Sequence, residues 1–266
     1  GNATGSQVDA LLRSMLTGDH RSSERARITL RRLGSDAVPI LVEKLNAATS
    51  SVRWAVVRVL GDFGFDAKPA TSRLVLLLRD SLAQIRAETA RALGQIGHSD
   101  PDVVALLVQR LADNESSVRT AAATALGRFG SDAKSAIQPL IKAAEDPNPH
   151  VRVAAAAAVW SIDNSEKRLI PKLIEALQDR DKEVAGQARN ALCRMGQASL
   201  PHLLRGLKHN DISVRTECAR AIGEMASAYA CMEGAIPALI ESLRHDATSA
   251  HAMALGQFGP EAVEAV

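Results

Sequence analysis

The histidines of this sequence are the side chains best suited to acid–base or metal chemistry, and their spacing favours neither. The seven histidines are scattered, mostly where turns are expected, and no His-Glu-x-x-His motif occurs. The cysteines Cys193, Cys218 and Cys231 are an odd number without Cys-x-x-Cys spacing. We interpret them as buried or half-buried thiols in a reducing compartment, which predicts a cytoplasmic protein. The sequence therefore predicts no catalytic residue, no metal site and no cofactor.

A second set of side chains with possible chemistry is a column of arginines spaced by about 33 residues or a multiple of that period. The column consists of Arg53, Arg86, Arg119, Arg152 and Arg215. A row of guanidinium groups could bind successive phosphates of a nucleic acid, since each neutralised phosphate needs its own cation. The alternative is that the arginines tie neighbouring repeats together, and we favour this structural role. Lys plus Arg is 32 and Asp plus Glu is 30, so the chain has no large field of one sign.

The arginines belong to a repeated segment, and residues 118–130 are its clearest copy. Val118, Ala122 and Ala125 lie at helical spacing with Leu126 and form one apolar stripe. Gly130 follows the stripe, where the C-terminal cap of a helix needs a residue that can take positive φ. Shifts of about 33 residues in both directions give about eight copies, and repetition at a fixed period predicts a solenoid.

A second, more variable helical segment lies between each pair of copies. Each repeat is therefore predicted to contain a helix A, a short turn and a helix B, where B is the repeated segment. We expect helix A at 6–17, 36–47, 67–79, 100–112, 134–145, 166–178, 198–208 and 234–244. We expect helix B at 21–33, 51–63, 83–96, 116–129, 149–162, 182–195, 212–226 and 247–258. The predicted fold class is an all-α, right-handed α-solenoid of about eight helix pairs without strands.

The turn between helix A and helix B carries an aspartate in four repeats. These are Asp80, Asp113, Asp146 and Asp179, each five residues before the valine position of helix B. An aspartate there is expected to accept hydrogen bonds from the free amides at the start of helix B. Asn148 followed by Pro149 offers the same cap by another route.

The two ends of the chain differ in character. Residues 1–5 are small and polar, and we treat them as a leader remnant, with Ser6 as the expected cap of the first helix. Residues 6–266 then form a single array. Residues 259–266 resemble the start of a ninth helix A, which predicts that the array continues. Leu243 to Ala254 spans 11 residues where Leu111 to Ala125 spans 14, so a turn is shorter or residues are missing near Asp246.

The segments 85–97 and 118–130 share the phrase Val/Ile-Arg-x-x-Ala/Thr-x-x-Ala-Leu-Gly-x-x-Gly, and this phrase resembles HEAT-like repeats of the phycobilisome-lyase type. The resemblance extends over about residues 6–266. It implies that helix A lies on a convex side and helix B on a concave side. It also implies a ladder between the turn aspartates and the arginine column, with interruptions at Ala185 and Thr248. Some HEAT-like enzymes, such as deoxyhypusine hydroxylase, hold two irons with paired His-Glu dipeptides, and this chain has no such dipeptide.

The expected concave face carries polar side chains of both signs, at three, six and ten positions after the valine of helix B. Asp62, Glu217 and Glu224 interrupt its arginines, and such a mixed groove suits a protein partner better than a phosphate backbone. Either tryptophan could anchor a partner, although helix packing is the alternative. The predicted partner-binding residues are Trp54, Arg58, Glu88, Arg91, Arg128, Trp160, Arg194 and Arg220.

These observations predict a non-catalytic scaffold that binds another protein on the surface of its B helices. No apolar run approaches the roughly 20 residues of a membrane span. Three alternatives stay open. One is a bilin lyase subunit or chromophore chaperone, which rests on the family resemblance. Another is a nucleic-acid-binding protein, which the mixed charge of the groove disfavours. The third is an ordinary solvated surface without a partner.

Overall fold

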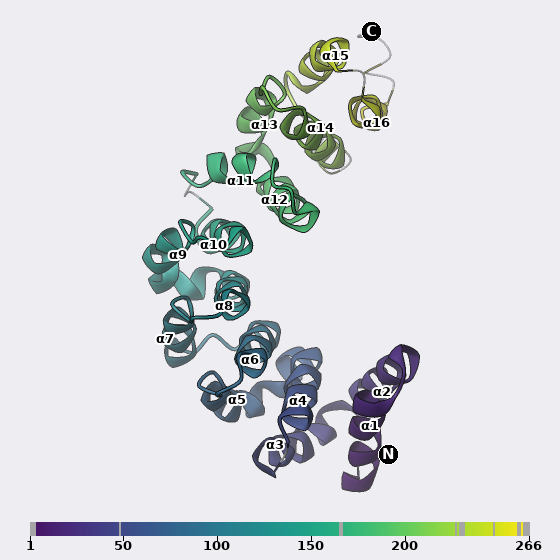
Figure 1. The fold of residues 1–266 in the computed structure, drawn as a ribbon, viewed down its shortest axis with the longest axis vertical. Coiled ribbons are helices and arrows are strands. Elements are labelled where there is room, and N and C mark those ends of the chain that lie inside the picture. Colours follow the sequence, from purple (N-terminus) through teal and green to yellow (C-terminus); the bar gives the residue numbers. More distant parts are fainter. Residues whose placement is uncertain are drawn as a thin grey trace. The chain divides into compact units, whose positions relative to one another are not determined.

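A computed structural model describes residues 4–47, 49–164, 167–226, 228, 232–246, 248–259 and 262 of the chain. These residues contain sixteen α-helices and four short 3₁₀ helices, and no strand lies within them (Figure 1). The helices alternate in A and B pairs along the chain. The predicted all-α solenoid is confirmed.

The B helices keep the bounds expected from the sequence to within a few residues. They are α2 (His20–Arg32), α4 (Ser50–Asp62), α6 (Ala83–Ile96), α8 (Ser116–Arg128), α10 (Pro149–Ile162), α12 (Lys182–Met195), α14 (Ile212–Ala226) and α16 (Ser249–Gln257). The A helices are α1 (Gly5–Thr17), α3 (Ala37–Ala47), α5 (Thr71–Leu77), α7 (Pro101–Arg110), α9 (Ile137–Ala143), α11 (Ile170–Ala176), α13 (Leu200–Gly206) and α15 (Ala235–His245).

Several A helices are shorter than predicted because 3₁₀ turns occupy their expected first residues. These turns are η1 (Gly34–Asp36), η2 (Gly64–Ala70), η3 (Gly130–Ala136) and η4 (Gly196–Ala198). Gly64 and Gly130 have φ of 56° and 55°, as expected for glycines that end helix B. The chain then turns at once, and Pro69 lies within η2, where its missing amide cannot support an α-helical hydrogen bond.

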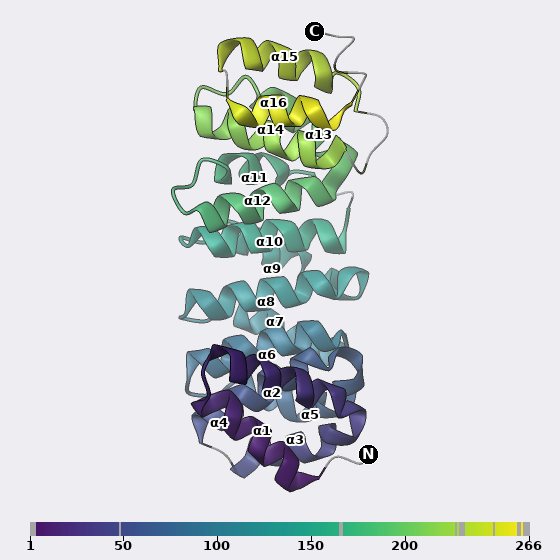
Figure 2. The same ribbon diagram turned by 90° about the vertical axis from the view of Figure 1, so that its right-hand side faces the viewer.

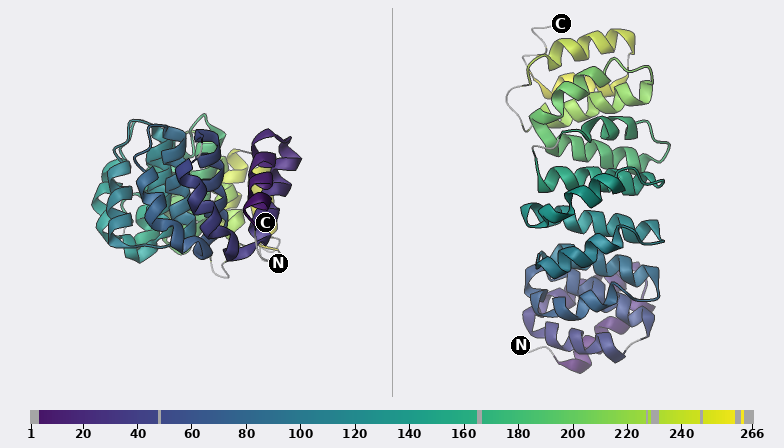
Figure 3. Two further views of the ribbon diagram at one scale, coloured as in Figure 1. Left: turned by 90° about the horizontal axis from the view of Figure 1, so that it is seen from below. Right: turned by 90° about the vertical axis from the view of Figure 1, so that its left-hand side faces the viewer.

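The described residues group into two compact units. The first unit reaches to Ala143 and includes Ser161–Asp163. The second unit contains Ala144–Trp160 and the residues from Asn164 onward. In the first unit α3, α5 and α7 lie on one side, and α4, α6 and α8 lie on the other (Figure 1). In the second unit α13 pairs with α14 and α15 with α16 in the same way. Figure 3, right, shows the side of each unit on which the A helices lie.

The start of the first helix differs from the prediction. The N-cap residue of α1 is Thr4, whose side chain accepts a hydrogen bond from the amide of Gln7 at 3.4 Å. Ser6 lies inside the helix, so the prediction that it caps the helix is wrong. A threonine oxygen with extended backbone geometry can satisfy one of the free amides of the first turn, and Thr4 has that geometry.

The turn aspartates close the turn that precedes helix B. Asp80 accepts from the amide of Leu82 at 2.9 Å, and Asp113 accepts from the amide of Glu115 at 3.1 Å. Asp146 and Asp179 make the same contact two residues ahead, at 2.8 and 2.9 Å. The amide reached in this way precedes the helix, so the predicted capping role is corrected. An aspartate side chain readily closes a local turn of this kind.

Asn148 does cap its helix, as predicted. Its side-chain oxygen accepts from the amide of His150 at 2.9 Å, and Pro149 is the first residue of α10. Because proline lacks an amide hydrogen, its place at the start of a helix leaves no donor unsatisfied.

Neighbouring B helices within each unit pack closely along a column of glycines, which consists of Gly61, Gly94 and Gly223. A Cβ atom on Gly94 would lie 2.7 Å from the Cα of Ala125, and one on Gly223 would lie 2.8 Å from the Cα of Ala254. These distances are too short for a side chain. The glycine column therefore lets α6 meet α8 and α14 meet α16 at close range; Figure 2 shows the B helices side by side within each unit.

Trp160 and Cys193 occupy the glycine-column position in α10 and α12, and both are half-buried. Cys218 is fully buried, and burial is the main reason why the pKa of each of these two thiols rises to about 12. Since a thiolate is the reactive form of cysteine, both side chains are suited to packing. The prediction of buried or half-buried thiols is confirmed for Cys193 and Cys218, and Cys231 lies outside the described residues.

The last helix pair contains a buried histidine that makes its stability depend on pH. His251 is fully buried; its Nε2 lies 2.8 Å from Ser242 Oγ and its Nδ1 lies 2.6 Å from Thr248 Oγ1. Ser242 donates to the carbonyl of Leu207 at 3.3 Å, so it accepts from Nε2, and Thr248 donates to Nδ1. Burial lowers the pKa of His251, and the weaker opposing influence of Asp246 does not restore it. The folded protein therefore favours the neutral form of the His251 imidazole.

We expect the free energy of unfolding to fall as the pH is lowered from 7.5 to 5.5. Below a pH of about 6.5 the unfolded chain binds a proton that folded His251 does not, so acid favours unfolding. The replacement His251→Gln should weaken this dependence, since glutamine keeps a donor and an acceptor without titrating. Urea titrations at each pH, followed by circular dichroism, measure the effect. Equal pH dependence of the two proteins would contradict it.

Candidate protein-binding surface

The arginine column lies between neighbouring repeats, and Arg86 shows its geometry most completely. Its Nε and Nη2 donate to the two carboxylate oxygens of Asp113, each at 2.8 Å. Its Nη1 donates to the carbonyls of Asp80 and Ser81 at 2.9 and 3.1 Å. One guanidinium group thus joins the turn of its own repeat to the turn of the next. The side chain of Asp113 is only 4% exposed, which makes the pair sensitive to the loss of either partner.

Other members of the column lie in equivalent places. Arg53 is 3.4 Å from the carboxylate of Asp80, and Arg215 forms an ion pair with Asp246. Arg119 donates to the carbonyls of Asp113 and Asn114 at 2.9 and 3.0 Å. These side chains serve the contacts between repeats and turns. Asp246 was not among the predicted residues, because the shorter spacing near it shifts it out of register with the other turn aspartates.

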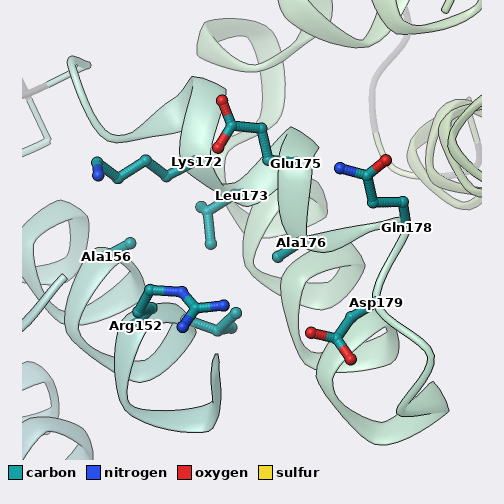
Figure 4. Close-up of a pocket in the computed structure, with 9 residues that line it drawn as sticks. Arg152, Ala156, Lys172, Leu173, Glu175, Ala176, Gln178 and Asp179 are labelled. Atoms are coloured by element: carbon teal, nitrogen blue, oxygen red, sulfur yellow. The ribbon is translucent and has the colours of Figure 1, made fainter. Parts of the chain in front are cut away.

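Arg152 and Asp179 are the pair that the structure does not bring into contact. Arg152 donates to the carbonyls of Asp146 and Pro147, each at 3.0 Å, but no hydrogen bond joins it to Asp179 in the described structure. A cavity of about 240 Å³ lies at this place, with Lys172 and Leu173 also on its wall. Figure 4 shows the Arg152 guanidinium directed toward Asp179 across it. The predicted ladder is therefore interrupted here, and not only at the positions that lack arginine.

The B helices of the first unit carry a surface that we call the arginine face, made by Trp54, Arg58, Arg91 and Arg128. The guanidinium carbon of Arg58 lies 5.2 Å from the ring centre of Trp54, a cation–π distance. Arg91 and Arg128 are exposed on α6 and α8. Neither Arg58 nor Arg128 has an ion-pair partner among the residues that the structure describes. Four of the predicted partner-binding residues thus share one unit and one set of helices.

The acidic residues of the same surface lie deeper than the arginines. The side chain of Glu88 is 16% exposed, while that of Arg91, 3.9 Å away, is 45% exposed. Burial raises the pKa of Glu88 above its usual range, and Arg91 and Arg58 oppose this effect. Ala55, which lies three residues after Val52 and was expected on the groove, is also inaccessible because it is fully buried. Glu88 is therefore placed below the surface formed by the arginines.

The second unit holds the remaining predicted residues, Trp160, Arg194 and Arg220, and their surroundings differ. Arg194 is exposed on α12, and Arg220 is bonded to Glu217 of its own helix at 2.7 Å. Glu217 also accepts from Arg189 at 2.6 Å. The predicted partner-binding residues thus fall into two groups, one in each unit. In the second unit Glu217 is shared between Arg220 and Arg189.

Arg189 is a residue that sequence reasoning missed. It joins α12 to Glu217 and to Glu224 of α14, at 2.6 and 3.1 Å. In the first unit Arg27 makes the equivalent contact from α2 to Asp62 of α4 at 3.1 Å. Both arginines lie at the same place in their repeats, and an acidic residue lies 35 positions later in each case. That recurrence was the available signal.

No group of three or more histidine, cysteine, aspartate or glutamate side chains that could hold a metal ion occurs within the described ranges. None of the helices described here has the length and apolar character needed to cross a lipid bilayer. These are observations on the described residues alone.

A family model for HEAT repeats matches residues 71–160 and 170–256. No curated protein matches the chain. The solved structure of YibA from Escherichia coli is 23% identical, with a TM-score of 0.58 and 98% of each chain covered.

The complex of CpcE and CpcF of phycocyanin lyase from Nostoc is also similar, at 19% identity and a TM-score of 0.56, covering 92% of this chain and 95% of that one. Kap95p, solved with RanGDP, is 15% identical with a TM-score of 0.57, and the match covers 97% of this chain and 40% of Kap95p. At these identities the solved structures show a shared fold. The repeated helix pairs and the match over more than half of the residues show that this chain belongs to the HEAT-repeat family.

Proposed function

We propose that this chain is a non-catalytic scaffold that binds another protein through the arginine face of its first unit. The observation that carries the proposal is the exposure of Arg91 and Arg128 beside the Arg58–Trp54 pair. The described contacts between repeats include those of the arginine column, the glycine column, and Arg27 and Arg189. The arginine face is therefore not needed to hold the described repeats together, and its side chains are available to a partner.

The composition of the arginine face suits protein recognition. Tryptophan and arginine are enriched among the residues that contribute most to protein–protein binding, because they offer a large contact area and several directed donors. The ring of Trp54 is half-buried and holds the guanidinium of Arg58 in place. A side chain held in this way loses less conformational entropy on binding than a freely rotating one.

A photo-crosslinking amino acid at Gln95 tests the proposal independently of charge. Gln95 is exposed on α6, four residues after Arg91, and Gln109 is exposed on α7, an A helix of the same unit. In cells that make the chain, we expect a covalent adduct with one defined protein from position 95 and not from position 109. Equal adducts from both positions, or none from position 95, would contradict the proposal. Mass spectrometry of the adduct identifies the protein.

A bilin-handling role is the second candidate. A cavity of about 500 Å³ in the second unit supports it, since Lys208, His209, Arg215 and His245 on its wall could meet the carboxylates of a tetrapyrrole. The phycocyanin lyase complex shares the fold. A shift in the absorbance of a bilin on mixing with the chain, lost in the variant Lys208→Gln/His245→Gln, would favour this role over the scaffold.

A further inference from the structure

The cavity of about 240 Å³ beside Arg152 is the place where an arginine of the column and a turn aspartate stay apart. Its wall belongs to the second unit, and α10 and α11 supply most of it. Nη1 of Arg152 donates to two backbone carbonyls, while its Nε and Nη2 have no hydrogen-bond partner among the residues that the structure describes. In Arg86 the same two nitrogens bind both oxygens of Asp113. Two donors of Arg152 therefore remain for a ligand.

The carboxylate of Asp179 faces this guanidinium across the cavity (Figure 4). Its Oδ1 accepts from the amide of Asp181 at 2.9 Å, and no cation is bonded to the carboxylate in the described part of the chain. Lys172 also lines the cavity, but its Nζ lies 2.5 Å from Oε1 of Glu145. The cavity therefore presents one cation and one anion that face each other and form no ion pair in the described structure.

The rest of the cavity wall is largely aliphatic. In Figure 4, Leu173 and Ala176 lie above the space between the two charges. Val153 and Ala156 of α10 complete this part, and both are buried, as is Leu173. The volume is below the roughly 300–1,000 Å³ that is typical of pockets for drug-sized molecules, so a ligand of this cavity must be small.

From these observations we propose that the cavity binds a free aliphatic α-amino acid, with its carboxylate on Arg152 and its ammonium group on Asp179. A guanidinium group binds a carboxylate through two parallel charged hydrogen bonds, here from Nε and Nη2. The ammonium group donates to Asp179, and the aliphatic side chain lies against Leu173 and the two alanines. The inference is independent of the proposed scaffold function, whose surface lies in the first unit.

The facing charges favour a dipolar ligand over a simple ion. An anion bound to Arg152 would be repelled by Asp179, and a cation bound to Asp179 would be repelled by Arg152. An amino acid satisfies both charges and adds no net charge to the cavity. A charged side chain on that amino acid would lie against the aliphatic wall and lose its hydration. Valine, leucine and isoleucine are therefore the expected class of ligand.

Isothermal titration calorimetry of the full chain with L-leucine tests the inference, and we expect a dissociation constant below about 1 mM. N-acetyl-L-leucine lacks the ammonium group, L-leucinamide lacks the carboxylate, and L-aspartate places a second carboxylate against the aliphatic wall. Each should bind at least about tenfold more weakly, because one charged contact contributes about that factor. The two leucine derivatives also represent the ends of a peptide, so they distinguish a free amino acid from a chain terminus. Equal binding of leucine and any of the three, or no binding of leucine, would overturn the inference.

The variant Asp179→Asn removes the anion but keeps an oxygen that can accept from the amide of Asp181, so the turn should be retained. It should weaken leucine binding at least about tenfold without weakening that of N-acetyl-L-leucine, which has no ammonium group to lose. Ala176→Leu leaves both charges and fills the cavity, so it should also lose leucine. Arg180→Gln is the matched control, because Arg180 is exposed and does not line the cavity, and its affinity should stay within about twofold of the parent. Leucine binding retained by either of the first two variants, or lost in the control, would contradict the assignment of this cavity.

Discussion

The replacement Gly94→Val is expected to lower the free energy of unfolding by about 3 kcal/mol, at the upper end of the usual range for overpacked sites. A Cβ atom at this position would lie 2.7 Å from the Cα of Ala125, an atom of the neighbouring helix backbone that cannot rotate away. The helices α6 and α8 must therefore separate, which weakens all the contacts along their length. Urea unfolding followed by circular dichroism gives the change in midpoint.

Gly256→Ala is the matched control for this prediction. Gly256 also lies inside a B helix, but among the described residues no atom beyond its own helix backbone and chain neighbours lies within 4 Å of the place where its Cβ would be. Alanine is favoured over glycine in a helix by up to about 1 kcal/mol, so this variant should be as stable as the parent or slightly more stable. A loss of stability as large as that of Gly94→Val would show that close helix packing is not the reason.

The replacement Asp113→Asn is expected to cost about 2–3 kcal/mol of unfolding free energy. The carboxylate of Asp113 is almost completely buried and receives two hydrogen bonds from Arg86 and one from the amide of Glu115. The amide side chain keeps the shape but has one acceptor fewer and no charge, which leaves the guanidinium of Arg86 poorly compensated. Chemical unfolding of the two proteins under the same conditions measures the difference.

The exposed ion pair between Lys208 and Glu241 provides the comparison. Its side chains are 66% and 56% exposed, so Glu241→Gln should change stability by less than about 0.5 kcal/mol.

The contribution of Asp113 to the free energy of unfolding should also depend on pH. Burial of the carboxyl raises its pKa, but the hydrogen bonds from Arg86 and the Glu115 amide outweigh this and leave the pKa lowered. Its stabilisation is therefore present above a pH of about 3.9 and is lost as the pH falls through the lower folded value.

The B helices were the part of the fold most accessible to prediction. The apolar stripe and the final glycine recur in register, and the predicted span 83–96 is the span of α6. The A segments were predicted less well, because their first turns depend on how tightly the chain leaves the glycine that ends the preceding helix. The 3₁₀ turn from Gly64 to Ala70 is an example: a helical pattern in the sequence cannot distinguish it from an α-helix.

The binding surface was harder to predict than the fold, since sequence spacing assigns a side chain to a helix face but does not give its depth. Glu88 and Arg91 are three residues apart on the same helix, yet one is largely buried and the other exposed. The pairing of Arg27 with Asp62 joins residues of different repeats and changes which charges remain available. The separation of Arg152 from Asp179 depends on how two helix pairs pack, and identical residue types meet elsewhere in the chain.

The arginine face is tested most directly by the dissociation constant between this chain and the partner protein that is identified by crosslinking and then purified without the crosslinker. The variant Arg91→Glu/Arg128→Glu reverses two charges of the face, and Arg73→Glu/Arg79→Glu reverses two exposed charges on the A side of the same unit. We predict a dissociation constant at least about 100-fold higher for the first variant, as expected when two interface contacts become repulsive. The second variant should stay within about twofold of the parent. Equal affinity of both variants would contradict the assignment of this surface as the binding site.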